Sequence, residues 1–222
     1  MKKKLLSALL VATCVVSMAA CGSDKKEKEA KADKIIVGTE AGFAPYEYMK
    51  GNEVVGIDMD IAKAIADDMG KELEIKNMDF DGALAAVASG KVDFVAAGVS
   101  IDEDSLKTMD FYHEYVNSTE VIVVNGDSPA VTPAGAELSG TDLDGKVVAV
   151  QQGNIADIWV SNEKNCKPKE VKRYTKFAQA AEDLKNNKVD CIVMDQYPAE
   201  QLVASNGTLK ILDGVLFERS EE

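Results

Sequence analysis

The chain has 222 residues, with 38 acidic and 25 basic side chains that give a net charge of −13. A hydrophobic fraction of 46% is typical of a folded protein and argues against a disordered one. So acidic a chain is a poor partner for nucleic acid and has no electrostatic attraction to anionic lipid.

The first 20 residues have the pattern of an export signal. Three lysines at positions 2–4 precede an apolar run at residues 5–20, which is shorter than the roughly 20 residues of a membrane-spanning helix. The segment resembles a bacterial lipoprotein signal, which implies cleavage before Cys21 and a lipid on its sulfur. The protein would then be extracytoplasmic and anchored to the cell membrane by that lipid alone. An ordinary export signal followed by an unrelated cysteine is the alternative.

Cleavage would leave 202 residues with a charge of −16, enough for one large domain or two small lobes. Residues 21–34 contain almost no apolar side chain and cannot contribute to a core. We therefore expect them to form a flexible tether, with the folded part beginning at Ile35.

Only Cys166 and Cys191 would remain as free thiols, because Cys14 leaves with the signal and Cys21 carries the lipid. Export would allow Cys166 and Cys191 to pair. However, Cys191 lies in a predicted strand and Cys166 in a predicted loop, and disulfide geometry is strict, so we expect unpaired thiols. No spacing of cysteines around His113 fits a zinc site, and we expect neither a metal nor another cofactor.

Strands and helices alternate along the rest of the chain. Short apolar runs predict strands, and apolar residues at helical spacing predict helices. This alternation predicts parallel sheets flanked by helices, and hence an α/β fold. The expected strands are residues 35–38, 72–75, 92–97, 120–124, 147–150, 170–174, 189–194 and 209–212, and the expected helices are 57–69, 81–89, 154–163, 177–185 and 198–204.

Two of these helices have a distinct apolar face at helical spacing. The residues of these faces are Ile57, Ile61, Ile65 and Met69 in the first, and Ile155, Ile158 and Trp159 in the second. We interpret the second face as a core face rather than as a platform for a ligand.

A weak internal repeat indicates two similar lobes. Residues 91–93 and 188–190 both read Lys-Val-Asp, and each follows a predicted helix and opens a predicted strand. Their separation of about a hundred residues is the size of one lobe. A chance match of three residues is the alternative. Residues 125–140, rich in Gly, Pro and small residues, predict a loop at the start of the second lobe.

The expected ligand site follows from the strand ends, because ligands of open α/β sheets bind beyond the carboxyl ends of the strands. The residues there offer carboxylates, aromatic faces, a hydroxyl group and a helix start, whose free N–H groups favour an anion. Such a set suits a small zwitterion or cation. The residues are Thr39, Glu40, Phe43, Phe80, Gly98, Ser100, Gln151, Gly153, Asn154 and Asp195.

Each of these residues also has an ordinary structural explanation. The two phenylalanines could belong to the core. Ser100, Asn154 and Asp195 could cap helices. Glu40 could be a solvated charge in a loop.

Six short motifs occur together along the chain. They are GTEAGFAPYEY at residues 38–48, GIDMD at 56–60, MDF at 78–80, AGVSI at 97–101, LDGKVVAV at 143–150 and VMD at 193–195. Together they resemble the polar-amino-acid class of extracellular solute-binding proteins, which includes glutamine-binding and lysine/arginine/ornithine-binding proteins. The resemblance runs from Ile35 to the end of the chain.

The resemblance implies a two-lobe, periplasmic-binding-protein-like α/β fold, in which each lobe is a mostly parallel sheet flanked by helices and two strands form a hinge. We expect the first lobe at residues 35–115, the second at 116–218 and the start of a return hinge at 219–222, with bending near 115–119. The protein, which we expect to be a monomer, would close on an amino acid or a cationic amine. It would deliver this ligand to the permease of an ABC importer.

The resemblance also implies roles for residues of the first lobe. Phe43 and Phe80 would sandwich the ligand's side chain. Gly98 and Ser100 would add polar contacts. Glu40, where the family usually has aspartate, would bind the ligand's side chain or its ammonium group.

Residues of the second lobe would bind the α-amino and α-carboxylate groups. Asp195 would take the α-ammonium group, and Asn154 and Ile155 would present backbone N–H groups to the carboxylate. The family usually adds an arginine clamp after Ser100, but Ser105 stands there in this chain, and serine cannot replace a bidentate clamp. We therefore hypothesise a ligand of net positive charge, or one without a free carboxylate.

A second departure concerns the C-terminus. Family members usually return from the second lobe to the first, and this chain stops at Glu222, about where that return begins. We therefore expect a C-terminally truncated first lobe.

Two other functions stay open. An enzyme of the same fold, resembling a dehydratase, could use Glu40 or Asp195 as an acid or base, although no Ser–His–Asp or Cys–His set is visible. His113 is expected at the surface or hinge. A surface sensor that binds without transport is the other alternative.

Overall fold

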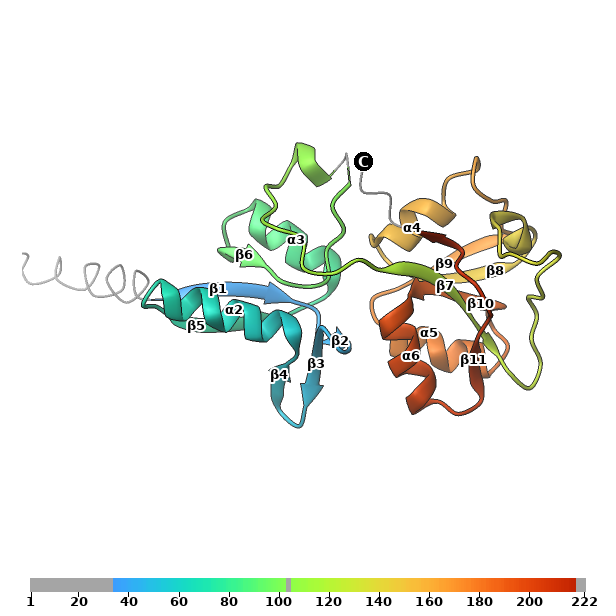
Figure 1. Ribbon diagram of the computed structural model, residues 1–222, viewed down its shortest axis with the longest axis horizontal. Helices are drawn as coiled ribbons and strands as arrows, with labels where there is room; N and C mark the ends of the chain where they lie inside the picture. Colours follow the sequence, from blue (N-terminus) through green and yellow to red (C-terminus); the bar gives the residue numbers. More distant parts are fainter. Residues whose placement is uncertain (1–33, 103–104, 219–222) are drawn as a thin grey trace, which may run out of the picture.

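The structure, a computed structural model, describes residues 34–102 and 105–218. Two lobes lie side by side, and the chain crosses from the first to the second just before strand β7 (Figure 1). The predicted signal, the lipid attachment at Cys21, nearly all of the tether and the return hinge at 219–222 fall outside the described residues. Within the described ranges, no helix has both the length and the apolar character needed to span a membrane.

The first lobe is built on a short parallel sheet with the strand order β5-β1-β6. Helix α3 packs on β1 and β6, and helix α2 packs on β5. The carboxyl end of β1 points toward the second lobe (Figure 1), and β5 and β6 are parallel to it. The elements are β1 (Lys34–Thr39), α2 (Ile57–Asp68), β5 (Glu72–Asn77), α3 (Phe80–Ala88), β6 (Phe94–Val95) and the 3₁₀ helix η2 (Ser105–Lys107).

An antiparallel meander follows β1, and the sequence analysis did not predict it. Its strands are β2 (Gly42–Phe43), β3 (Glu47–Lys50) and β4 (Glu53–Val55). Strands of two to four residues are too short to show a clear alternation of apolar and polar side chains. For the same reason the strand predicted at 92–97 was overestimated, since only the two residues of β6 form it.

The second lobe contains a six-stranded sheet, ordered β11-β7-β10-β8-β9, with β12 also paired to β7. Strands β10, β8 and β9 are parallel, as predicted, but β7 runs antiparallel to β10, β11 and β12. The sheet is mixed because the crossing chain starts β7 at the end of the sheet where β10 finishes, so that Glu120 pairs with Asp195. The elements are β7 (Thr119–Asn125), η3 (Gly140–Leu143), β8 (Val147–Gln151), α4 (Ile155–Val160), β9 (Glu170–Tyr174), α5 (Phe177–Lys185), β10 (Cys191–Asp195), α6 (Gln196–Ser205), β11 (Leu209–Ile211) and β12 (Phe217–Glu218).

This second sheet is buried on both faces. Successive residues of β7 alternate between two clusters, with Val121 and Val123 packed against α5 and α6, and Ile122 and Val124 packed with α4. Burial on both sides explains why residues 121–124 of β7 form an unbroken apolar run. Cys166 and Cys191 lie in the second cluster as unpaired thiols, as expected.

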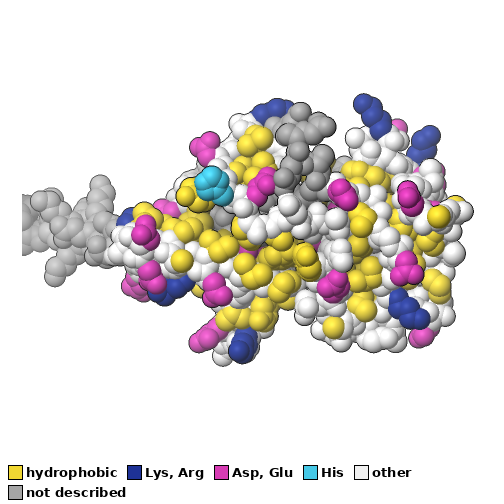
Figure 2. Space-filling view, viewed as in Figure 1, with side chains coloured by type: hydrophobic (Ala, Val, Ile, Leu, Met, Phe, Trp, Pro, Cys, Tyr) yellow, Lys and Arg dark blue, Asp and Glu magenta, His cyan; other side chains and the backbone are white. Residues whose placement is uncertain are grey.

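The apolar face predicted for α2 is not its buried face. Asp58, Met59 and two alanines are buried, whereas Ile57, Ile65 and Met69 are exposed. Small side chains let the helix approach the sheet, and the larger ones then point outward. Apolar side chains accordingly gather over α2 and the meander on the face shown in Figure 2.

Helix α4 ends three residues earlier than predicted, at Val160. The side chain of Asn165 donates to the carbonyl oxygen of Trp159, which takes up a free acceptor at the helix end. Trp159 stacks on Phe217 with 4.4 Å between ring centroids, as a core face should. Ile158 does not belong to that face, because it is 52% exposed and lies in the wall of the cavity described below.

Candidate ligand-binding site

A cavity lies between the two lobes, at the carboxyl ends of strands of both sheets. Its enclosed space is about 50 Å³, whereas a typical small-molecule site has roughly 300–1,000 Å³. This cavity is therefore smaller than an ordinary small-molecule site. All eight residues predicted to bind the ligand line this cavity: Glu40, Phe43, Phe80, Gly98, Ser100, Asn154, Ile155 and Asp195.

The cavity wall is acidic. Four carboxyl groups line it, and among the described residues no lysine or arginine does. They belong to Glu40, Glu47, Asp102 and Asp195, of which the first, second and fourth are at most 2% exposed. Burying carboxylates together costs free energy that a proton or an opposite charge can offset. The wall therefore favours a cation.

Glu40 follows β1 and is held from the second lobe. Its Oε2 accepts a hydrogen bond from Gln151 Nε2 at 3.1 Å, and its Oε1 lies 3.7 Å from the ammonium nitrogen of Lys176. Burial raises the pKa of the Glu40 carboxyl, and Lys176 opposes that rise. With 1% of the residue exposed, Glu40 is not the solvated loop charge that was the alternative.

Glu47, on β3, was missed because no strand was predicted there. Neither of its carboxyl oxygens has a hydrogen-bond partner among the described residues. Burial and the neighbouring Asp58 carboxylate raise the pKa of Glu47 to about 12, so Glu47 is neutral at ordinary pH. Asp58 itself accepts hydrogen bonds from Tyr115 Oη at 2.8 Å and from the backbone N–H of Gly98 at 3.1 Å.

The two phenylalanines are both core residues and cavity residues. Phe43 stacks on Tyr46 in its own lobe and on Phe177 in the other, with centroid distances of 5.8 and 6.1 Å. Phe80, at the start of α3, is 8% exposed. Gly98 permits this packing, because it has a φ of +55° and a Cβ there would lie 2.8 Å from Phe43 Cε1.

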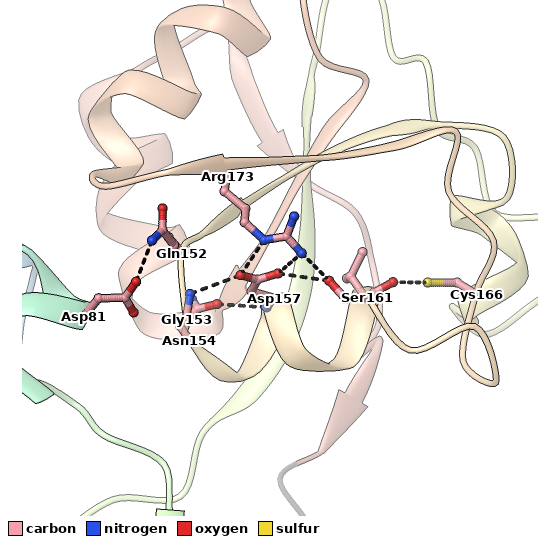
Figure 3. Close-up of polar contacts among 9 residues, drawn as sticks. Asp81, Gln152, Gly153, Asn154, Asp157, Ser161, Cys166 and Arg173 are labelled. Carbon is pink, nitrogen blue, oxygen red and sulfur yellow. Dashed lines mark hydrogen bonds and ion pairs between the residues drawn. The ribbon is translucent and has the colours of Figure 1, made fainter. Parts of the chain in front are cut away.

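The turn before α4 is tightly fixed (Figure 3). Asn154 caps the helix, since its side chain accepts from the N–H of Asp157 at 2.9 Å. The Asp157 carboxylate in turn accepts from the N–H of Gly153 at 3.1 Å and pairs with the guanidinium of Arg173 at 2.9 Å. The capping role expected for Asn154 is therefore correct. Its buried amide nitrogen nevertheless has no partner among the described residues and remains available at the cavity wall.

Two further expectations concern caps and the missing arginine. Asp195 precedes α6 but makes no capping hydrogen bond with its side chain, so capping does not explain it. Ser105 does line the cavity, and its hydroxyl group donates to the carboxylate of Asp102. Exposed His113 is absent from the lining residues.

A further polar contact joins the lobes, between residues that do not line this cavity. Gln152 Nε2, in the second lobe, donates to Asp81 Oδ2 in the first at 2.6 Å. Gly153 follows, and a Cβ there would lie 1.9 Å from the Asp81 carboxylate, so only glycine allows this approach. Sequence spacing could not reveal these contacts, because they join residues about seventy positions apart.

The comparisons agree with this geometry. Residues 35–156 match the family of bacterial extracellular solute-binding proteins, family 3. The arginine-binding extracellular protein ArtP of Bacillus subtilis (strain 168) is 35% identical over 214 residues, which cover 95% of this chain and 79% of that protein. The L-cystine-binding protein TcyJ of Escherichia coli (strain K12) is 27% identical over 216 residues, covering 96% and 77%.

Solved structures give the same result. The arginine-bound form of truncated ArgBP from T. maritima superposes with a TM-score of 0.77 at 36% identity, covering 86% of this chain and 87% of that one. The amino acid ABC transporter substrate-binding protein AbpA from Streptococcus pneumoniae, bound to L-arginine, also gives 0.77, at 31% identity and with 88% and 80% covered. Two lobes of this fold, a cavity between them and these matches together show that the chain belongs to the bacterial extracellular solute-binding proteins, family 3.

Proposed function

We propose that the chain is the substrate-binding component of an amino-acid ABC importer and that it captures a small cation, with arginine as the first candidate. The observation that carries this proposal is the cavity wall, with four carboxyl groups and, within the described part of the chain, no basic side chain. The names of ArtP and of the T. maritima ArgBP, both arginine-binding, support it. An extracytoplasmic location accords with an extracellular family.

In the proposed complex the cationic end of the ligand lies beside Glu40. Phe43 and Phe80 flank its aliphatic stem, because aromatic faces accept both methylene groups and cations. Asp195 takes the α-ammonium group, while Gly98 and Ser100 add polar contacts. These roles place carboxylates at both ends of an extended cation.

The α-carboxylate has weaker donors in this site. Ser105 stands where the family has arginine, and its hydroxyl group is directed to Asp102. The unpartnered amide nitrogen of Asn154 and the backbone N–H of Ile155 are the donors that we propose. A cationic amine without a carboxylate is therefore the second candidate ligand.

Closure of the lobes is the proposed mechanism, with residues 35–115 and 116–218 moving as units about a bend near 115–119. Tyr115 donates a hydrogen bond to Asp58 of the first lobe, and Thr119 begins strand β7 of the second lobe. The ligand shifts the equilibrium toward the closed form by its greater affinity for that form.

Titration calorimetry and thermal unfolding of a Cys21→Ser protein test the ligand assignment. The panel contains arginine, lysine, histidine, cystine and glutamine, with agmatine and cadaverine as amines lacking the carboxylate. Ligand at a hundred times its Kd should stabilise the protein by about 2.7 kcal/mol. We expect a cation to bind most tightly, and a neutral amino acid that bound more tightly than every cation would refute the proposal. Equal affinities for arginine and agmatine would show that binding does not need the ligand's carboxylate.

Variants then test whether each of the two carboxylates contacts the ligand. Glu40→Gln should weaken arginine and agmatine alike, since both carry the guanidinium group. Asp195→Asn should weaken both as well, because agmatine keeps the primary amine that corresponds to the α-ammonium group of arginine. Glu200→Gln, at an exposed position of α6, serves as the control and should leave both affinities unchanged.

We also propose that Cys21 carries a lipid that holds the protein at the membrane. The apolar run ending in small residues before Cys21 motivates this proposal. Cells fed a fatty acid with an alkyne tag should label the wild-type protein and not Cys21→Ser. Labelling of both, or of neither, would count against lipidation.

Catalysis and sensing without transport are weaker candidates, since the relatives reported above are named as binding proteins. Nuclear magnetic resonance of the ligand after prolonged incubation distinguishes catalysis, and we expect the ligand to remain intact. Loss of arginine uptake when the gene is deleted would distinguish import from sensing.

A further inference from the structure

Lys176 is the basic side chain that approaches the acidic cavity from outside its lining. It precedes α5, and its ammonium nitrogen lies 3.7 Å from Glu40 Oε1, across the boundary between the lobes. The other oxygen of Glu40 is hydrogen-bonded to Gln151. Glu40 therefore has one oxygen fixed by an amide and one that faces a cation at more than hydrogen-bond distance.

The two partners differ in how firmly they are held. The Glu40 side chain is 1% exposed, whereas that of Lys176 is 44% exposed. Phe177, the next residue, is buried and stacked on Phe43, so the backbone at Lys176 is fixed while its side chain reaches into solvent. Lys176 can leave Glu40 by rotating its own flexible stem, with no movement of the helix.

We propose that Lys176 is a selectivity residue, whose ammonium group occupies Glu40 in the empty closed site and is displaced by the cationic end of the ligand. The inference rests on the proposed function, since it requires a cationic ligand at Glu40. A neutral ligand leaves the Lys176–Glu40 pair in place. Lys176 thus opposes cations and favours neutral ligands, and it reduces the preference for cations that the ionised carboxylates of the cavity wall create.

Removing Lys176 should therefore raise the ratio of arginine affinity to glutamine affinity. In Lys176→Met, the empty closed form loses an ion pair, but the arginine complex, in which the lysine is already displaced, loses nothing. Arginine affinity should rise by about fivefold, which corresponds to an ion pair of ~1 kcal/mol. Glutamine affinity should stay level or fall, because the closed complex with a neutral ligand still uses the pair.

The matched control is Lys169→Met. Lys169 is exposed and precedes β9, whereas Lys176 lies just beyond the other end of the same strand. Both variants remove one positive charge from the second lobe, so a general effect of net charge would appear in both. We expect Lys169→Met to leave the ratio of arginine to glutamine affinity at the wild-type value.

The pH dependence of arginine affinity is a second test, because a purely structural role of Lys176 would not change it. The titratable groups near Glu40 are Lys176 at the start of α5, Asp79 before α3 and Glu47 on β3. Without Lys176, burial and the Asp79 carboxylate raise the pKa of Glu40 with no cation to oppose them. Protonation then competes with arginine at higher pH, so the affinity of Lys176→Met for arginine should fall more steeply on acidification than that of the wild type.

Calorimetry of the full-length Cys21→Ser protein with arginine and glutamine decides the matter, and Lys176→Gln replaces Lys176→Met if the latter does not fold. A ratio of arginine to glutamine affinity that rises in Lys176→Met alone supports the inference. An unchanged or lower ratio, with arginine still bound by the parent protein, overturns the inference and leaves the proposed function standing. Failure of the parent protein to bind any cation overturns both.

Discussion

Glu47 shows how the environment of one residue sets its charge. It is 1% exposed, and within the described ranges neither carboxyl oxygen has a hydrogen-bond partner. Burial and the Asp58 carboxylate raise its pKa to about 12, and so it keeps its proton in the folded protein. The neutral acid can donate a hydrogen bond at the cavity wall, which an ionised glutamate cannot.

Stability should therefore depend on pH through Glu47. Between about pH 5 and pH 8 the group ionises only in the unfolded chain, which favours unfolding by up to about 1.4 kcal/mol per pH unit. Glu47→Gln abolishes this loss, so its free energy of unfolding should gain on that of the wild type as pH rises. Urea unfolding at several pH values measures the difference, with exposed Glu53→Gln as the control. Parallel curves for Glu47→Gln and wild type would contradict the assignment.

Gly98 is a second residue whose effect on the site can be tested separately from its effect on stability. Gly98→Ala adds a Cβ 2.8 Å from Phe43 in a backbone with φ of +55°, whereas Gly70→Ala has φ of +65° and nothing within 4 Å. Both should lose about 1 kcal/mol of stability from the backbone conformation. Gly98→Ala should in addition weaken ligand binding several-fold, because Phe43 must shift. Equal affinities for the two variants would show that Phe43 is not part of the site.

The turn before α4 acts as a unit. Asp157 is 10% exposed and connects the N–H of Gly153 to the guanidinium of Arg173, which fixes the position of Asn154 at the cavity (Figure 3). A carboxylate so buried depends on its partner, because an unpaired charge there would be costly.

Arg173→Met should therefore lower the free energy of unfolding by roughly 1–3 kcal/mol and weaken ligand binding as the turn loosens. Arg173→Lys keeps the positive charge but not the paired geometry of the guanidinium group. Its stability and ligand affinity should therefore lie between those of the wild type and Arg173→Met. Chemical unfolding and calorimetry on the same samples test both effects. A stable Arg173→Met protein with normal affinity would show that the turn does not need its ion pair.

Among the helices and strands, regular periodicity predicted element bounds well, whereas buried small residues made the buried face of a helix hard to predict. The strand at 170–174 and the helix at 177–185 have the predicted bounds, because their side chains alternate or repeat clearly. The apolar face of α2 was wrong because Ala62 and Ala66, both fully buried, carry the packing instead of the isoleucines. Short strands, as in the meander, carry too few residues for a pattern to emerge.

The candidate site was predictable where it depends on strand ends. All eight predicted residues line one cavity, because parallel strands bring their carboxyl ends together. Glu47 lies in the unpredicted meander. Lys176 lies in the other lobe from Glu40, and its pairing over 136 positions has no local signal in the sequence.

The whole molecule is held closed by a few contacts between the lobes. The hydrogen bond from Gln152 to Asp81 contributes about 1 kcal/mol, so its loss should shift the balance toward the open form about fivefold. Gln152→Ala should therefore have a larger radius of gyration in solution without ligand, and saturating arginine should restore compactness. Small-angle X-ray scattering measures this, with Lys63→Ala as a control that loses an ion pair within α2 only. A radius insensitive to ligand would contradict closure.

The stacking of Phe43 on Phe177 has a thermal consequence. These rings belong to different lobes, so opening exposes both to water, and closure on a ligand buries them again. Burial of apolar surface lowers the heat capacity, and the hydrophobic contribution weakens on cooling. Binding should accordingly become more exothermic as temperature rises, and the empty protein should open more readily in the cold.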